Sequence, residues 1–225
     1  MRKAILGILF LILYFGVSAA IYFASAGRTD LPFAWAYFGT NLGMGIIFSI
    51  ILEMVNPGLI AERFKPGPGE QDRFFKIGIS ILTLLMLIVA GLDVGRYHWS
   101  GPVAPWLQVA ALVFVVLGYL FMAWATLANR FFSSAVRLQS DRGQVVVDSG
   151  PYRFVRHPGY LGAIPYMAFG GLALGSWLAT VVAGVPMIAL LLRRTLLEDK
   201  MLQEGLSGYK DYTTRVKYRL APGIW

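Results

Sequence analysis

Residues 160–192 read YLGAIPYMAFGGLALGSWLATVVAGVPMIALLL and contain no charged residue. As one continuous helix this stretch would be ~50 Å long, whereas the hydrocarbon core of a bilayer is ~30 Å thick. Glycine at 170, 171 and 175, with Ser176, offers a place for the chain to turn. We therefore predict a tight helical hairpin that enters the membrane and returns to the side from which it started.

Four further uncharged runs precede the hairpin, and each is about one bilayer crossing long. They cover residues 4–27, 31–52, 77–92 and 101–129. The chain is 57% hydrophobic and 14% charged, which is typical of a multi-spanning membrane protein rather than a soluble domain. The sequence predicts an all-α, polytopic membrane protein with about six transmembrane helices.

The positions of the basic residues test this count independently. With six crossings, 18 of the 20 Lys and Arg residues fall on one side of the membrane. Basic loops mark the cytoplasmic side, so we expect both termini in the cytoplasm. The first apolar run exceeds the 7–15 residues of a signal-peptide core, which favours a retained helix over a cleaved leader.

Composition also argues against several functions. The chain has no cysteine, which excludes disulfides and thiol chemistry. The net charge of +8 is spread over short loops, so topology explains it better than nucleic-acid binding does. Glu53 and Asp93 end apolar runs, and we expect them to be exposed. Without an ionisable residue in mid-membrane, an ion pathway is disfavoured. The segment 64–72 is predicted to be a turn-rich loop.

Polar and charged groups gather instead on both sides of the hairpin. Residues 150–160 read GPYRFVRHPGY, and residues 193–199 read RRTLLED. Because a hairpin returns to its starting side, these two segments are expected to meet. In the tail, Tyr209 and Tyr212 are three residues apart and share one helical face. An interfacial aromatic belt is an alternative explanation for the two tyrosines, and lipid-headgroup anchoring for the arginines.

Three motifs in this region resemble the isoprenylcysteine carboxyl methyltransferase family, including its bacterial and archaeal relatives. The resemblance covers about residues 130–225. The motifs are Gly150-x-Tyr152-x-x-x-Arg156-His157-Pro158-x-Tyr160-x-Gly162, Glu198-Asp199-x-x-Leu202, and Gly208-Tyr209-x-x-Tyr212 followed by Arg219-x-x-Pro222-Gly223.

The resemblance implies an integral membrane methyltransferase that uses S-adenosylmethionine. The cofactor would bind in a cytoplasmic pocket closed by the C-terminal segment, and a lipophilic substrate would reach it laterally from the membrane lipids. Residues 1–128 would form four transmembrane helices and residues 129–225 the catalytic region. The implied cofactor-binding residues are Gln144, Val145, Val146, Val147, Tyr152, Arg156, His157, Pro158, Gly159, Tyr160, Glu198, Tyr209 and Tyr212.

Arg194 and Glu198 are the implied catalytic residues, and no metal is implied. Arg194 falls where the family places a substrate-contacting arginine, and it would hold a carboxylate acceptor by a bidentate pair. An amine acceptor would need a base, for which Glu198 or Asp199 is the candidate. Arg156 or Arg153 would hold the cofactor carboxylate. The chain departs from the family twice, with Asp199 in place of a second Glu and Gln144 in place of a His.

Three alternatives to a carboxyl methyltransferase stay open. The first is a phospholipid N-methyltransferase. The second is an NADPH-dependent reductase of the sterol-reductase type, which would need more basic residues around the cofactor phosphates. The third is a non-enzymatic membrane scaffold, which would bind no nucleotide-like ligand.

Overall fold

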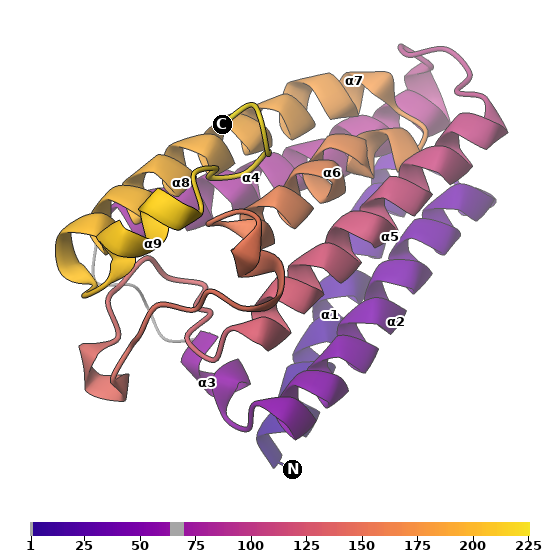
Figure 1. The fold of residues 1–225 in the computed structure, drawn as a ribbon. Coiled ribbons are helices and arrows are strands. Elements are labelled where there is room, and N and C mark those ends of the chain that lie inside the picture. The colour runs from indigo at the N-terminus through magenta and orange to yellow at the C-terminus, as the bar shows by residue number, and fades with distance from the viewer. Residues whose placement is uncertain (1, 64–69) are drawn as a thin grey trace.

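The computed structural model describes residues 2–63 and 70–225, and every regular element in that part of the chain is a helix (Figure 1). The all-α prediction is thereby confirmed for the described residues. Most of the loop expected at 64–72 lies outside them. Gln144–Val147, which the resemblance implies in cofactor binding, is an irregular segment without a paired strand.

Four long helices form the first part of the molecule: α1 (Arg2–Ala26), α2 (Pro32–Val55), α4 (Glu70–Leu92) and α5 (Pro105–Ala128). Proline begins α2 and α5, where its missing N–H costs no helical hydrogen bond. A single turn, α3 (Leu59–Arg63), follows α2. A π-helical turn, Asp93–Tyr97, continues α4 toward the loop before α5.

The hairpin consists of α6 (Pro158–Ala173) and a returning helix made of α7 (Trp177–Ala179), a π-helical turn at Thr180–Gly184, and α8 (Val185–Gly205). The chain turns at Gly175, whose φ of +94° is strained for any residue with a Cβ. Ser176 caps the returning helix by accepting a 3.0 Å hydrogen bond from the N–H of Ala179. The turn therefore lies where the sequence predicted it.

The returning helix is longer than the uncharged run. It spans Trp177–Gly205, 29 residues, and so carries the charged residues beyond Leu192 on the same rigid element. No Gly or Pro stands between residues 187 and 204 to end it earlier. Short helices, Ser140–Arg142, Gly150–Arg153 and α9 (Tyr209–Arg215), complete the part outside the hairpin.

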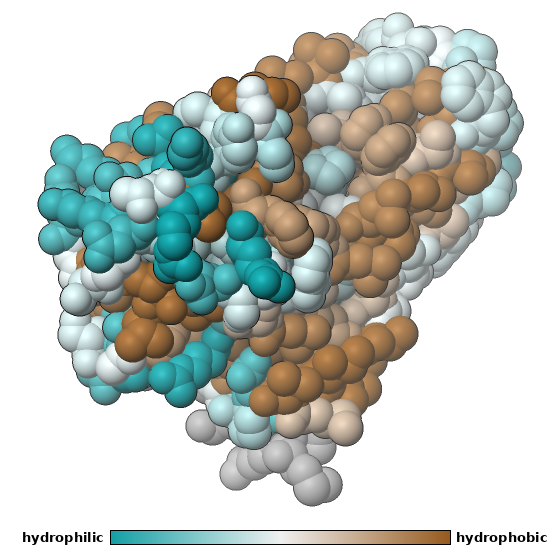
Figure 2. Space-filling view, in the orientation of Figure 1, coloured by the Kyte–Doolittle hydropathy of each residue, from teal (hydrophilic) through white to brown (hydrophobic). Residues whose placement is uncertain are grey.

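Five helices are long and apolar enough to cross a membrane: residues 6–26, 32–55, 72–97, 105–128 and 177–205. The α6 arm has 16 residues, or ~24 Å, slightly less than the ~30 Å of a bilayer core. Large apolar side chains lie on the outside, with Leu13 65% and Ile47 60% exposed. Figure 2 shows this apolar surface along the helices and hydrophilic side chains at the end that contains α9. The chain is an integral membrane protein; the count of six crossings and the cytoplasmic termini stay predictions.

Glycines allow α5 and α6 to approach closely. A Cβ on Gly118 would lie 2.6 Å from the carbonyl oxygen of Gly162, and a Cβ on Gly162 would lie 2.6 Å from that of Gly118. Small residues at such crossings give close backbone packing in lipid, where no hydrophobic effect drives helices together. This contact fixes α6, and with it the start of the polar region, against α5.

Asp93 is buried, and its predicted exposure is wrong. Only 1% of the residue is exposed. Its carboxylate accepts hydrogen bonds from the N–H and hydroxyl of Ser100, at 2.8 and 2.5 Å, and from the hydroxyl of Ser176 at 2.5 Å. Asp93 was expected to be exposed because it ends an apolar run of the sequence. In the folded chain the hairpin turn packs over its carboxylate. Glu53 is half-buried.

Candidate functional site

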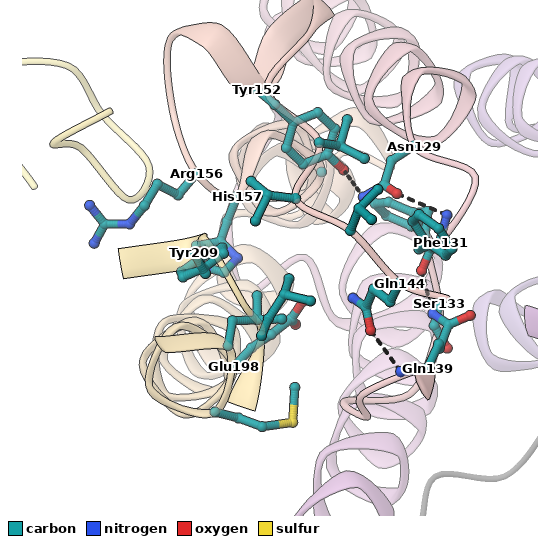
Figure 3. Close-up of a pocket in the computed structure, with 18 of the residues that line it drawn as sticks. Asn129, Phe131, Ser133, Gln139, Gln144, Tyr152, Arg156, His157, Glu198 and Tyr209 are labelled. Carbon is teal, nitrogen blue, oxygen red and sulfur yellow. Dashed lines mark hydrogen bonds between the residues drawn. The ribbon is translucent and has the colours of Figure 1, made fainter. Parts of the chain in front are cut away.

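A polar pocket lies where the segment after α5 meets α6, α8 and α9 (Figure 3). Its cavity volume is about 90 Å³. All of the predicted cofactor-binding residues except Pro158 line it. Pro158 is buried at the first position of α6, and Arg194 lies outside the lining. The hairpin thus brings the two remote polar segments together; their role in binding stays a prediction.

Glu198 faces the pocket from α8 and is linked to the opposite arm of the hairpin. Its carboxylate accepts a hydrogen bond from the hydroxyl of Tyr160, and that hydroxyl accepts one from Nε of Arg194 at 2.8 Å. Among the described residues that line the pocket, Glu198 is the one that is acidic. The chain Arg194–Tyr160–Glu198 therefore fixes where a negative charge is presented to a ligand.

Arg194 is buried and already engaged by the protein. Its Nη2 donates to the carbonyl of Ser134 at 2.7 Å, and its guanidinium lies 4.3 Å from the ring centre of Phe75. Nη1 is 2.9 Å from Asp72 Oδ1, close enough for an ion pair but not aligned as a hydrogen bond. In this arrangement Arg194 positions Tyr160 rather than facing the pocket.

Asp72 is a contributor that the sequence did not reveal. It is 5% exposed at the start of α4, accepts from the N–H of Val136 at 3.2 Å, and pairs with Lys76 at 2.9 Å as well as with Arg194. The site therefore draws on the region 1–128, which was expected to hold only transmembrane helices. Asp72 was assigned to a loop by its turn-rich neighbours, and no motif links it to residue 194.

Asp199 does not face the pocket, although it is adjacent to Glu198. It is 1% exposed and lies between Arg156, His157 and the tail. Its carboxylate contacts six nitrogen or oxygen atoms at 2.8–3.2 Å: Arg156 Nε and Nη2, His157 Nε2, Gln203 Nε2, Tyr209 Oη and Arg219 Nε. The alternative in which Asp199 acts as a base is not supported, because this carboxylate is fully occupied.

Arg156 occupies the pocket wall, but its charge is used within the protein. Besides Asp199, its Nη1 donates to the carbonyls of Val216 at 3.0 Å and Lys217 at 2.7 Å. Figure 3 shows its guanidinium directed away from Gln144 on the opposite wall. Arg153, the other expected cation, is exposed and lies outside the lining. Four of the five N–H groups of Arg156 are thus engaged within the protein, and Arg153 does not reach the pocket lining.

The C-terminal segment closes one side of the pocket. The N–H groups of Arg156 and His157 donate to the carbonyls of Tyr218 and Arg219, at 3.0 and 2.9 Å. The hydroxyl of Tyr212 donates to the carbonyl of Tyr152 at 2.6 Å. Burial, followed by the charge of Asp199, raises the pKa of Tyr209 above its ordinary value, so its hydroxyl stays a donor to that carboxylate.

Gln144–Val147 form the opposite wall. Within residues 2–63 and 70–225, no backbone hydrogen bond is made by Val145, Val146 or Val147. Their N–H and C=O groups are thus available to a ligand, as on an exposed sheet edge. The side chain of Gln144 accepts a 2.7 Å hydrogen bond from the N–H of Gln139, so it braces the wall.

A second, larger cavity of about 490 Å³ lies among α1, α2 and α5. Leu11, Phe48 and Met122 are typical of its apolar lining, with Lys76 and Ser134 as polar members. The neighbours of Ser134, at positions 133 and 135, line the polar pocket. A single strip of chain, residues 133–135, therefore separates an apolar cavity among the helices from the polar pocket.

Sequence reasoning also missed several apolar lining residues, among them Phe131, Phe132, Met201 and Leu206. Phe132 packs so closely that a Cβ on Gly159 would lie 2.7 Å from its ring. Leu202 was quoted as part of a motif without a role. An i, i+4 spacing from Glu198 to Leu202 was the one available signal that both face the same cavity.

These features define a class: a polytopic membrane protein in which a polar pocket, built on a helical hairpin and closed by the tail, adjoins an apolar intramembrane cavity. Residues 110–204 match the model of the isoprenylcysteine carboxyl methyltransferase (ICMT) family, and this match supports assignment to that family of membrane methyltransferases. No curated protein matches the chain. The matched range includes the hairpin and Glu198 but neither Asp72 nor the tail.

Proposed function

We propose that the protein is an S-adenosylmethionine-dependent methyltransferase whose acceptor is a lipophilic molecule drawn from the membrane. The observation that carries this proposal is the adjacency of the two cavities across residues 133–135. A methyl donor is polar, whereas a lipid acceptor needs an apolar environment for its chain. The positive-inside pattern supports an active site facing the cytoplasm.

The residues of the polar pocket fit the chemistry of S-adenosylmethionine. Phe131, Val146 and Leu206 offer apolar surface for an adenine ring, and the free backbone of Val145–Val147 offers hydrogen bonds to its edge. Glu198 offers a carboxylate to hydroxyl or ammonium groups. The cavity of about 90 Å³ is smaller than the ~300 Å³ or more of ordinary ligand pockets, so binding requires the wall to move outward.

When bound, S-adenosylmethionine supplies an electrophilic methyl group on a cationic sulfur. The chain's own residues then need to orient the two partners and exclude water. Tyr160 and Arg194 hold the Glu198 carboxylate in one orientation. Tyr209 and Tyr212 cover the pocket from α9. A carboxylate acceptor is ionised at neutral pH and needs no base.

The leading acceptor is a prenylated cysteine carboxylate, because the ICMT family match includes the hairpin and the apolar cavity suits a prenyl chain. For a phospholipid amine, Glu198 is the base that the geometry offers, since it is the acidic residue that lines the pocket. Both acceptors use the same cavity, so direct comparison of the two substrates decides between them.

Titration calorimetry of the purified protein with S-adenosylhomocysteine and with NADPH tests the proposal. We expect binding of the adenosyl compound, and weaker binding in both His157→Ala and Glu198→Ala. Methyl transfer from labelled S-adenosylmethionine to a prenylcysteine acid and to phosphatidylethanolamine then compares the acceptors. Binding of NADPH alone would favour the reductase alternative, and absence of binding to either ligand would favour the scaffold.

A further inference from the structure

The proposed ligands carry carboxylates that the three expected arginines, Arg153, Arg156 and Arg194, are not placed to bind. The methionine part of the cofactor and a prenylcysteine acceptor each carry a carboxylate, and both would enter this pocket. Asp199 and two backbone carbonyls engage four of the five N–H groups of Arg156, and both Arg153 and Arg194 lie outside the lining. A buried carboxylate without a hydrogen-bond donor is strongly disfavoured. A further basic residue in the lining would supply that donor together with a compensating charge.

Among the described residues, Arg137 is the arginine other than Arg156 that lines the pocket. It lies on the segment between α5 and the pocket wall formed by Gln144–Val147, and its side chain is 16% exposed. Nη2 donates to Glu62 of α3 at 3.0 Å, and Nη1 is 3.7 Å from the exposed Asp141. The buried Nε has no hydrogen-bond partner among the described residues.

An unpartnered buried N–H on a charged group is unusual and costly in a folded protein. At Arg137 it occurs on a residue that lines the pocket, next to the strip 133–135 that separates the two cavities. Arginine binds carboxylates with parallel N–H donors, which Nε helps to supply. The position of Arg137 thus combines a free donor, a positive charge and access to the ligand.

We propose that Arg137 is the carboxylate-binding residue of this pocket. The inference rests on the proposed function and adds a binding residue that none of the three motifs contains. The carboxylate comes either from the amino-acid part of the cofactor or from the acceptor.

Arg137→Gln removes the charge and Nε, and Arg137→Lys keeps the charge but lacks the paired donors. Glu62→Gln is the matched control, because it breaks the same ion pair and leaves Arg137 unchanged. Arg153→Gln tests the exposed arginine that was expected to bind. Each variant is first checked for folding by its thermal unfolding in detergent.

The first arm measures affinity for S-adenosylhomocysteine and for 5′-methylthioadenosine, which keeps the adenosyl thioether but has no carboxylate. If the carboxylate is that of the cofactor, Arg137→Gln lowers the affinity for S-adenosylhomocysteine about 10- to 100-fold and leaves the affinity for 5′-methylthioadenosine unchanged. Arg137→Lys recovers part of the loss. The affinities of Glu62→Gln and Arg153→Gln for both ligands stay within about twofold of the wild type. That change is smaller than the loss of one hydrogen bond to a charged group.

The second arm measures the KM for a prenylcysteine acid and the inhibition constant of its carboxamide. If the carboxylate is that of the acceptor, Arg137→Gln raises the KM about 10- to 100-fold, while the carboxamide and both adenosyl ligands bind as before. Unchanged constants in both arms, or an equal loss in Glu62→Gln, would refute the role of Arg137. A wild-type protein that binds no adenosyl ligand would instead refute the proposed function, and this inference with it.

Discussion

At the scale of single residues, two adjacent acids have different roles. Glu198 lines the pocket, while Asp199 is buried among cationic and polar groups that hold the tail to the hairpin. Neighbouring residues on an α-helix point about 100° apart, so they face different partners. The replacement of a family Glu by Asp199 therefore concerns a structural contact rather than the pocket.

We expect Asp199→Asn to destabilise the protein by about 3–5 kcal/mol, since it leaves Arg156 and Arg219 without their shared counter-charge. The measurement is chemical or thermal unfolding in detergent. Asp30→Asn is the control, because Asp30 pairs with Arg28 on an exposed surface, where ion pairs contribute little to stability. Equal effects of the two substitutions would contradict the structural role of Asp199.

Asp72 is expected to act through Arg194, which it contacts from α4. Asp72→Asn lowers the methyl-transfer rate about tenfold by releasing Arg194, and through it Tyr160 and Glu198. The double variant Asp72→Asn with Arg194→Gln loses little more than Arg194→Gln alone, because coupled residues are not additive. Fully multiplicative losses in the rate would show that Asp72 acts elsewhere.

At the scale of elements, the hairpin is held at both of its ends. Gly118 and Gly162 bring α5 and α6 together, while Ser176 ties the turn to Asp93 beyond α4. The returning helix then carries Arg194, Glu198 and Asp199 as one rigid unit past the apolar run. Rigid helices locate side chains more exactly than loops do.

Gly118→Ala is expected to destabilise the protein by about 1–3 kcal/mol and to lower methyl transfer, because its Cβ would lie 2.6 Å from a backbone oxygen that cannot easily move. Gly43→Ala in α2 is the matched control. A Cβ there meets no atom within 4 Å, and removing a mid-helix glycine stabilises by ~0.5–1 kcal/mol. Unfolding in detergent compares the two, and a neutral Gly118→Ala would contradict the close α5–α6 contact.

At the scale of the whole molecule, the two ends of the helical bundle differ in chemistry. One end contains α9, the valine wall and the polar pocket, and the other contains the hairpin turn beside Asp93 (Figures 1 and 2). The positive-inside pattern predicts that the pocket end faces the cytoplasm. The proposed methyl donor is a metabolite of the cytosol. The proposed function therefore requires the pocket to face the cytoplasm.

The absence of cysteine allows a direct test of this orientation, because a single introduced cysteine is the one thiol in the chain. We expect Lys210→Cys, on the exposed face of α9, to react with a membrane-impermeant maleimide only after the membrane is opened. Tyr97→Cys, 59% exposed before α5, should react in intact cells. The reverse labelling pattern would place the pocket on the outer side.

The sequence by itself determined the membrane class, the helical hairpin and the meeting of residues near 157 with those near 198. These follow from hydropathy, run length and charge, which act along the chain and are independent of which helix packs beside which. The motifs identified the family and most residues that line the pocket.

Only the tertiary structure decided which polar group meets which. It buried Asp93 under the hairpin turn, brought Asp72 to Arg194 and occupied Arg156 with Asp199. The physical reason is that a charged side chain in a low-dielectric interior takes the nearest compatible partner in space. That partner is set by helix rotation and packing, which one-dimensional patterns do not encode.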